Sequence, residues 1–247
     1  MPAGTSRVPR FHVAMSLAPG ATLPLPPDAA HHAARVLRLH EDEPVVLFNG
    51  AGGEYAARIV RLSRDGVDVE IRAFSPIERE SPLAITLVQG ISAGDRMDLT
   101  IQKAVELGAS AIQPILAERS VVRLRGERGD SRREHWQRVA TAACEQCGRN
   151  RVPAVATALS LEDFRAPVDV LKLLLATAGS SGLRSMGVSI EMPVMVAAGP
   201  EAGFAPREEA LLVAAGFLPI RLGPRVLRTE TAGPAALAAL NALYGDG

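Results

Sequence analysis

A glycine-containing segment in the last quarter of the chain has the composition of a ligand-binding loop. Gly199–Gly203 follows the apolar run Val194–Ala198 and precedes a helix that Pro206 is expected to open. Ligands of open α/β sheets bind beyond the carboxyl ends of the strands, and glycine lets the backbone come close to them. Glu201 adds a carboxylate that can accept hydrogen bonds from a ribose or an amine. The segment therefore indicates a ligand site, with an ordinary glycine-rich turn as the alternative.

A second segment of this kind, Leu222–Ala232, follows another apolar run of strand length, Leu218–Leu222. It contains Arg225, Arg228 and Glu230, and its backbone offers many hydrogen-bond donors and acceptors. If the two segments lie side by side, they form an adenosine-sized pocket with a cationic wall. In the alternative interpretation, the arginines only pair with Glu230 or cap the helix that follows.

Two motifs that resemble known sites are better explained by local structure. Gly50–Gly53 begins like a dinucleotide-binding fingerprint, but that fingerprint needs a helix next, and the strand-like run Tyr55–Leu62 follows instead. Cys144 and Cys147 have the spacing of metal ligands, but structural zinc takes four ligands and the chain has two cysteines in all. We therefore predict a hairpin at the glycines, two thiols on one face of a helix, and no metal site.

The first forty residues combine aromatic and cationic side chains in a pattern that suits RNA. Arg10 precedes Phe11, and His31, Arg35 and Arg38 fall on one face of an expected helix. Arginine can contact phosphate and can also stack on an exposed base. A solvated helix face is the alternative interpretation of the same pattern.

Two differently built regions are expected to position these side chains. Residues 1–75 are expected to be β-rich, because short apolar runs alternate with the Asn-Gly and Asp-Gly pairs that are typical of hairpins. The expected strands and the one expected helix of this region are Val45–Phe48, Tyr55–Leu62, Val67–Ile71 and the helix Asp28–Leu39. A proline-spaced stretch from Phe74 to Pro82 then indicates a linker.

Residues 76–247 alternate strand-like and helical segments, which predicts a mainly parallel sheet covered on both faces. The expected strands are Leu83–Gln89, Ala111–Leu116, Val170–Leu175, Val194–Ala198 and Leu218–Leu222. The expected helices are Asp95–Leu107, Arg132–Cys147, Pro206–Ala215 and Pro234–Tyr244, with a short one after a capping box at Ser160–Asp163. The sequence therefore predicts an α/β protein with two domains, 1–75 and 76–247.

Composition narrows the class of protein further. With 247 residues and 47% hydrophobic content, the chain is long enough to bury a sizeable core. It has no apolar stretch long enough to cross a bilayer, and Met1–Arg10 lacks a signal-peptide pattern, so we expect a cytoplasmic protein with no membrane partner. A net charge of zero argues against binding nucleic acid by bulk charge. Seven arginines nevertheless gather between Arg119 and Arg138, where genomic composition bias is the alternative explanation.

Eight segments, taken in chain order, carry a resemblance to one known family. They are Arg10-Phe11, His32–Arg38, Asp95–Asp98, Gln102–Gly108, Arg119–Val121, Glu145–Arg149, Gly199–Glu201 and Leu222–Ala232. With these segments the chain resembles the bacterial 16S ribosomal RNA (uracil-N3)-methyltransferases, which belong to the SPOUT superfamily. The resemblance covers nearly the whole chain, and its last segment is long and specific. One departure is Ala202, where the family usually has a glycine.

The resemblance implies a PUA-like β-barrel in residues 1–75 and a trefoil-knotted α/β methyltransferase domain in residues 76–247. It also implies S-adenosylmethionine as the cofactor, 16S ribosomal RNA of the small ribosomal subunit as the substrate, and a homodimer. The cofactor-binding residues would be Thr177, Gly199, Pro200, Glu201, Gly203, Leu222, Gly223, Arg225, Val226, Leu227, Arg228, Thr231 and Ala232. The RNA-binding residues would be Arg10, Phe11, His32, Arg35, Arg38 and Arg123.

Methylation of uracil N3 requires the base to be exposed and its N3 proton to be removed. We assign Arg228 to stabilise the developing uracil anion, with Arg10 as the second candidate. Glu230 either accepts the proton or only orients Arg228. The competing hypotheses are methylation of a ribose 2′-hydroxyl or of a tRNA base, and an RNA-binding protein without activity. A nucleotide-dependent oxidoreductase is disfavoured, because the strand–glycine–helix fingerprint is missing.

Overall fold

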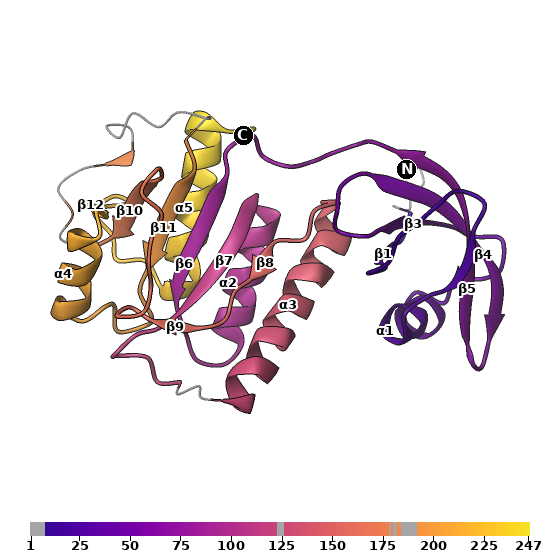
Figure 1. Cartoon of the computed structure of the whole chain (residues 1–247), viewed down its shortest axis with the longest axis horizontal. Coiled ribbons are helices and arrows are strands. Elements are labelled where there is room, and N and C mark those ends of the chain that lie inside the picture. Colours follow the sequence, from indigo (N-terminus) through magenta and orange to yellow (C-terminus); the bar gives the residue numbers. More distant parts are fainter. Residues whose placement is uncertain (1–7, 123–125, 178, 180–181, 184–191) are drawn as a thin grey trace. The chain divides into compact units, whose positions relative to one another are not determined.

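The computed structural model of the chain describes residues 8–122, 126–177, 179, 182–183 and 192–247 (Figure 1). The chain divides into two compact units. Unit 1 comprises the residues up to Glu80 together with Cys144–Val152, and unit 2 comprises Ser81–Ala143 and Pro153–Gly247. No pattern in the sequence predicts that Cys144–Val152 belongs with the first unit.

Unit 1 is built on a five-stranded sheet, which confirms the β-rich pattern of this region. Its strands are β1 (Arg10–His12), β2 (Thr22–Pro24), β3 (Pro44–Phe48), β4 (Glu54–Ser63) and β5 (Gly66–Ser75). They lie in the order β1-β3-β4-β5-β2, with β1 parallel to β3 and the other neighbours antiparallel. Ser63 pairs with Gly66 across a tight turn, so the hairpin predicted from Asp65-Gly66 is confirmed. The sequence does not predict β1 and β2, because three residues are too few to show an alternation of apolar and polar side chains.

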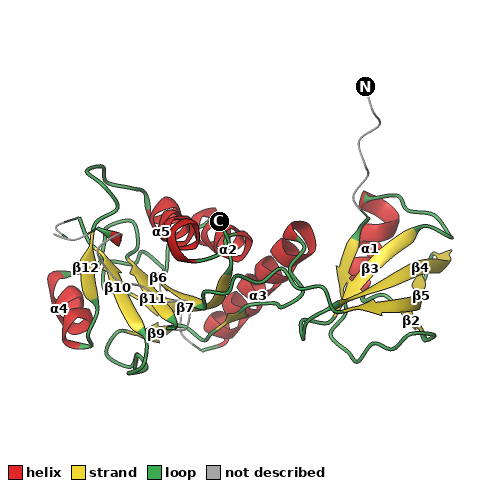
Figure 2. Cartoon of the chain, turned by 90° about the horizontal axis from the view of Figure 1, so that it is seen from above, coloured by secondary structure: helices red, strands yellow, loops and turns green. Residues whose placement is uncertain are grey.

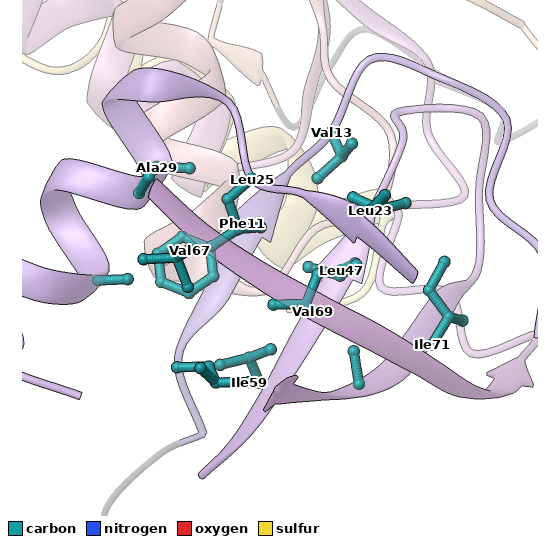
Figure 3. Packing of buried hydrophobic residues seen from close by; sticks show 14 of the residues in the cluster. Phe11, Val13, Leu23, Leu25, Ala29, Leu47, Ile59, Val67, Val69 and Ile71 are labelled. Atoms are coloured by element: carbon teal, nitrogen blue, oxygen red, sulfur yellow. The ribbon is translucent and has the colours of Figure 1, made fainter. Parts of the chain in front are cut away.

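Side chains from all five strands form the hydrophobic core of unit 1 (Figure 3). On β5, Val67, Val69 and Ile71 are buried, because residues two apart in a strand point to the same face of the sheet. Phe11 of β1 and Leu47 of β3 lie in the same core and are almost fully buried. Burial of large apolar side chains is the main source of stability for a unit of this size.

The helix predicted over Asp28–Leu39 is shorter and changes type. α1 (Pro27–His31) continues directly into the π-helical turn η1 (His32–Val36), where the Leu37 N–H closes an i→i+5 hydrogen bond. Arg38 then adopts a left-handed φ of 54°, which ends the helical turns.

Unit 2 contains a parallel sheet covered by helices, which confirms the predicted α/β class. Its strands are β6 (Ile85–Gly90), β7 (Ala109–Leu116), β8 (Ala154–Val155), β9 (Leu159–Ser160), β10 (Leu171–Leu175), β11 (Val194–Ala198) and β12 (Leu218–Ile220). The order is β12-β10-β11-β6-β7-β8, with β9 also pairing with β7. All these pairings are parallel.

Helices cover both faces of this sheet. The helices are α2 (Asp95–Glu106), α3 (Glu127–Cys147), α4 (Pro206–Ala214) and α5 (Thr229–Tyr244). α2 and α5 pack against each other on one face (Figure 2). There, Gly233 of α5 approaches Leu87 so closely that its absent Cβ would lie 3.1 Å from Leu87 Cδ1. Leu212 of α4 instead packs in a cluster with Val88 and Leu174, which face the opposite side.

The predicted start of the last helix is wrong. α5 begins at Thr229 rather than at Pro234, because the Arg228 carbonyl accepts the N–H groups of Thr231 and Ala232 and closes a turn ahead of the proline. A proline inside a helix removes one backbone hydrogen bond. The burial of this face of α5 against the sheet outweighs that loss. Part of the segment predicted as a loop is therefore the first turn of α5.

Two smaller predictions also differ from the structure. At the Ser160–Asp163 capping box, the Asp163 N–H donates to Ser160 Oγ at 3.2 Å, yet a turn follows instead of a helix. Pro167 lies too close to allow a helix, because the residue before a proline avoids helical angles. α3 begins at Glu127, ahead of the predicted start at Arg132.

Candidate active site

A cavity of about 380 Å³ lies at the edge of the sheet where β10, β11 and β12 end. These strands are parallel, so their carboxyl ends open onto the same side. Both segments that the sequence singles out contribute to its walls. The lining residues are Arg119, Leu175, Ala176, Thr177, Ala198, Gly199, Pro200, Glu201, Ala202, Gly203, Phe204, Glu209, Ile220, Arg221, Leu222, Arg225, Val226, Leu227, Thr229 and Ala232. The structure thus brings the two segments together at one pocket.

Close backbone packing shapes the Gly199–Gly203 segment. A Cβ on Gly90, the last residue of β6, would lie 2.5 Å from Pro200 Cδ and 2.6 Å from Pro200 N, closer than real atoms approach. The Gly203 N–H donates to the Pro200 carbonyl at 2.8 Å, and Gly203 adopts a left-handed φ of 70°. Ala202, which departs from the family pattern, is not in that left-handed region and therefore fits without backbone strain.

A buried hydrogen-bond cluster ties this segment to the start of α5. The Gln89 side chain is fully buried and donates through Nε2 to Thr229 Oγ1 at 3.2 Å and to the Gly199 carbonyl at 3.3 Å. The Thr229 hydroxyl donates to the same carbonyl at 2.8 Å, and its oxygen lies 3.0 Å from Ser92 Oγ. Gln89 Oε1 is buried and lacks a hydrogen-bond partner among the described residues, so the cluster is held by the donors of Gln89 and Thr229, and breaking either bond would leave a further buried polar group unpaired. The cluster therefore fixes the Gly199 loop against the first turn of α5.

Glu201 forms the second tie of the loop, toward α2. Its Oε1 accepts the Ala93 N–H at 2.9 Å and lies 3.0 Å from Arg96 Nη1. Burial alone would raise the pKa of the Glu201 carboxyl, but the hydrogen bonds from Ala93 and Arg96 outweigh it and lower the pKa. Glu201 is therefore a carboxylate at neutral pH, with one oxygen already held by the protein.

The charged side chains around the cavity are mostly cationic. Arg119, Arg221 and Arg225 line it together with two carboxylates, Glu201 and Glu209. Arg119 Nη1 also donates to the Ala202 carbonyl at 3.3 Å, which braces the glycine loop. The wall is thus suited to a ligand that carries both an anionic and a cationic group.

A smaller cavity of about 270 Å³ adjoins the first. It is lined by Arg96, Glu201, Arg228, Thr229 and Glu230. Two of these residues, Glu201 and Thr229, line both cavities, so the cavities meet at that pair. The smaller one is the more densely charged, with two arginines and two glutamates among its five residues.

The structure places the predicted cofactor-binding residues as follows. Those that line the larger cavity are Thr177, Gly199, Pro200, Glu201, Gly203, Leu222, Arg225, Val226, Leu227 and Ala232. Arg228 lines the smaller cavity instead, and Gly223 and Thr231 line neither. Residues that sequence reasoning missed include Arg96, Arg119 and Thr229.

The predicted RNA-binding residues of unit 1 fall into two groups. His32, Arg35 and Arg38 are exposed around η1, as a binding role requires. Phe11 lies in the hydrophobic core with 1% of its surface exposed, so no face of its ring is open to a base. This burial argues against the predicted contact of Phe11 with RNA. Arg123 lies outside the described residues.

Arg10 is held inside unit 1. Its guanidinium is bound through Nη1 to Glu54 Oε2 at 2.5 Å and through Nη2 to Asn150 Oδ1 at 2.5 Å, and it stacks 5.0 Å from the Phe48 ring centroid. Arg79 Nη1 also donates to Glu54 Oε2, at 2.9 Å. Burial would raise the pKa of the Glu54 carboxyl, but the two arginines lower it to about 2. These contacts give Arg10 a structural role and argue against the predicted catalytic one.

We expect the Glu54→Gln variant to unfold with a free energy lower by about 2 kcal/mol at pH 7, because a buried arginine loses a charge-assisted partner. The pKa of Glu54 is depressed in the folded state, so its contribution is present above pH 4.5 and is lost as the pH falls toward 2. Urea titrations of both proteins between pH 7 and 3 measure this difference. Arg61→Gln is the control, because Arg61 is 59% exposed in its pair with Asp68 and should change stability little. Equal stability of Glu54→Gln and wild type at pH 7 would show that the Glu54–Arg10 pair does not stabilise unit 1.

The sequence also led to predictions about metal ions and membranes. Among the described residues, no group of three or more histidine, cysteine or acidic side chains is placed to hold a metal ion. Cys144 is buried, which raises the pKa of its thiol to about 12. In the same part of the chain, none of the helices combines the length and apolar character that a membrane span needs.

Comparison with protein families gives two matches. Residues 79–241 match the RNA methyltransferase domain family, and residues 25–72 match the RNA methyltransferase PUA domain family. The resemblance to RNA methyltransferases and the PUA-like character of the first region are thereby confirmed. The trefoil knot stays a prediction.

Individual relatives point the same way. The ribosomal RNA small subunit methyltransferase E of Synechocystis sp. is 34% identical, over 90% of this chain and 74% of its own length. The protein of that name from Mycobacterium bovis is 33% identical, over 91% and 87%. A protein from Legionella pneumophila, solved in complex with the bound cofactor SAM, has 40% identity and a TM-score of 0.94 over 98% of this chain and 100% of its own. The ribosomal RNA small subunit methyltransferase E of Neisseria gonorrhoeae, bound to S-adenosyl methionine, has 39% identity and a TM-score of 0.90, over 97% and 99%.

Proposed function

Because this chain belongs to the RNA methyltransferase family, we propose that it methylates N3 of a specific uridine in 16S ribosomal RNA, with S-adenosylmethionine as the methyl donor. The observation that carries the proposal is the meeting of two cavities at Glu201 and Thr229. The larger has the size of a nucleoside derivative, and the smaller has Arg228 and Glu230 in its wall. A methyl donor and its acceptor need two such adjoining sites.

The residues of the larger cavity fit S-adenosylmethionine. Arg119, Arg221 and Arg225 offer hydrogen-bond donors that would hold its carboxylate. Glu201 and Glu209 offer acceptors for its ribose hydroxyls and ammonium group. The Gly199–Gly203 loop also lines this cavity, so its backbone groups lie where the adenine edge would bind. When bound, the cofactor supplies a sulfonium methyl group, whose bond to sulfur breaks as the bond to N3 forms.

Arg228 and Glu230 supply the acid–base part of the reaction at the acceptor base. A permanently charged guanidinium beside the base stabilises the uracil anion and thereby lowers the pKa of N3–H. Glu230, on the first turn of α5, accepts the N3 proton and releases it to water. The anionic N3 is then the nucleophile for the methyl group, and no metal or covalent enzyme intermediate takes part.

Unit 1 supplies the RNA-binding surface in this proposal. His32, Arg35 and Arg38 are exposed around η1, where they can reach phosphates or unstacked bases. Val36 and Leu37 lie among them and are also exposed, at 62% and 42%. Cationic side chains can contact RNA phosphates, and arginine planes can stack on unpaired bases.

Incubation of the purified protein with S-adenosylmethionine and unmodified 16S ribosomal RNA or small subunits tests the proposal. Mass spectrometry of nucleosides from the digested RNA should show N3-methyluridine at one position. A 2′-O-methylated nucleotide, or a product in tRNA instead, would assign the chain to one of the competing methyl acceptors. Saturable cofactor binding without any methylated product would favour an RNA-binding protein that lacks activity.

The proposal also includes a homodimer, which the family resemblance implies, and a cytoplasmic location, which the sequence predicts. Val226 beside the cavity and Leu243 on α5 are 79% and 41% exposed, and such apolar side chains are available to a second copy. Light scattering should then give about twice the chain mass of 26.0 kDa. A mass of one chain at micromolar concentration would contradict the dimer.

A further inference from the structure

The smaller cavity contains an arginine that the proposed methyl transfer does not yet use. Arg96 lies in the first turn of α2 and lines this cavity, and no group of the RNA has yet been assigned to it. On the basis of the proposed function, we propose that Arg96 is the residue that makes the acceptor site select uracil over cytosine. Glu201 is its positioning residue, because the carboxylate holds the guanidinium at the junction of the two cavities.

The size and position of the cavity suit a single base. Its volume of about 270 Å³ leaves room for one pyrimidine ring. It adjoins the larger cavity at Glu201 and Thr229, so a base bound there lies next to a ligand of the larger cavity. Enzymes that act on a base unstack it into such a pocket.

Arg96 is held in place by Glu201 but keeps donors that are free to bind a ligand. Its Nη1 donates to Glu201 Oε1 at 3.0 Å. Among the described residues, the Arg96 side chain makes this one hydrogen bond. A guanidinium has several further N–H donors in a fixed plane. The Arg96 side chain is 51% exposed, so those donors are accessible to a ligand. Glu201 thus orients a donor group in the cavity wall.

The two pyrimidines differ in what they present to such a group. Uracil O4 is an acceptor, whereas cytosine carries an N4 amino group, a donor, at the same place. The N–H groups of Arg96 match O4 and repel the amino group. A free carboxylate would do the opposite, because acidic side chains accept from cytosine N4. The bond from Arg96 engages Oε1 of Glu201, so this carboxylate has one acceptor oxygen fewer to offer cytosine N4.

Selection against cytosine is chemically necessary at this site. Cytosine N3 already has a free lone pair, so it needs no proton removal before it attacks a methyl donor. A pocket that stabilises only the uracil anion would not exclude it. Sites that hydrogen-bond a specific group reject analogues that lack it much more strongly than apolar pockets do. Arg96 supplies that discrimination, while Arg228 acts on N3.

The test compares wild type and Arg96→Ala on two RNAs that differ only at the methylated position, which holds uridine in one and cytidine in the other. Single-turnover rates, mass spectrometry of the product nucleoside, and calorimetric titration with S-adenosylmethionine are the readouts. We expect the rate on uridine to fall about tenfold and the uridine-to-cytidine rate ratio to fall at least about tenfold. Affinity for S-adenosylmethionine should stay within roughly threefold of wild type.

Lys103→Ala is the matched control, because Lys103 is a cation of the same helix that pairs with Glu106 and lines neither cavity. It should leave both the rate and the ratio unchanged. An Arg96→Ala protein that melts like wild type but keeps the wild-type ratio overturns the proposal, even if its rates are lower on both RNAs. Absence of N3-methyluridine from the wild-type reaction is a different result, because it overturns the proposed function itself.

Discussion

Replacing Arg228 by alanine is expected to slow single-turnover methyl transfer by about 10²–10³-fold, the usual loss when one preorganised donor to a developing anion is removed. Arg228 shares the smaller cavity with Glu201 and Glu230. Once its positive charge is removed, the other lining cation, Arg96, is already paired with Glu201, and the Glu230 carboxylate raises the pKa of N3–H. The barrier to methylation therefore rises by the stabilisation that the guanidinium provides.

The fold should survive this replacement. Arg228 caps α5 through its backbone, because its carbonyl accepts the N–H groups of Thr231 and Ala232. Alanine keeps that carbonyl, and the Arg228 side chain is exposed and lines no part of the larger cavity. We therefore expect the melting temperature to be unchanged and the affinity for S-adenosylmethionine to stay within roughly threefold. Arg207→Ala is the control, since Arg207 is 74% exposed on α4 and pairs with Glu162.

The pH dependence of the rate separates catalysis from mere positioning. Alkaline solution supplies the uracil anion that the Arg228→Ala protein no longer favours, so its rate should rise with pH more steeply than that of wild type. Rapid-quench measurements between pH 6.5 and 9 give both profiles. A rate within about threefold of wild type at neutral pH, or parallel profiles, would show that Arg228 does not act on N3.

The strand ends that carry the candidate site are predictable from sequence because each lies within one local pattern. An apolar run followed by glycine marks β11 and the Gly199–Gly203 segment, and the same logic finds β12 and the segment after it. Parallel pairing then brings the two ends to one edge of the sheet. The local sequence pattern wrongly predicts that the last helix begins at Pro234. Tertiary packing lets α5 begin ahead of the proline.

The remaining side chains of the site come from distant parts of the chain. Arg96 meets Glu201 across 105 positions, and Gln89 meets Thr229 across 140. No periodicity or spacing reports a contact of that range in a single sequence. The available signal was the family resemblance at Asp95–Asp98, which points to the segment without giving a role to any residue in it.

At Arg10, the local sequence suggests a contact with RNA that the folded protein does not allow. A cation beside an aromatic residue near the start of the chain has the composition of an RNA contact. Its actual partners are Glu54, Asn150 and the ring of Phe48, and Asn150 lies 140 positions away. Composition predicts the kind of interaction that an arginine can make, but burial decides whether the partner is RNA or the protein itself.

The Gly90→Ala variant is expected to bind S-adenosylmethionine about 100-fold more weakly than wild type, which corresponds to a loss of about 2.8 kcal/mol. The new Cβ would lie 2.5 Å from Pro200 Cδ and 2.6 Å from Pro200 N, so the backbone of the glycine loop has to move. That loop forms one wall of the larger cavity. Overpacking at a close backbone approach typically costs about 1–3 kcal/mol, so stability should also fall.

Calorimetric titration with S-adenosylmethionine, together with thermal melting of each variant, measures both effects. Gly199→Ala should behave in the same way, because its Cβ would lie 2.8 Å from Phe204 N in the same loop. Gly129→Ala is the control: Gly129 is on α3, has nothing within 4 Å of an added Cβ, and alanine favours a helix. If Gly90→Ala bound the cofactor within about threefold of wild type, the loop at Gly199 would not be the wall that holds it. A folded Gly90→Ala protein with weakened binding would instead show that this loop holds the methyl donor at the carboxyl edge of the sheet.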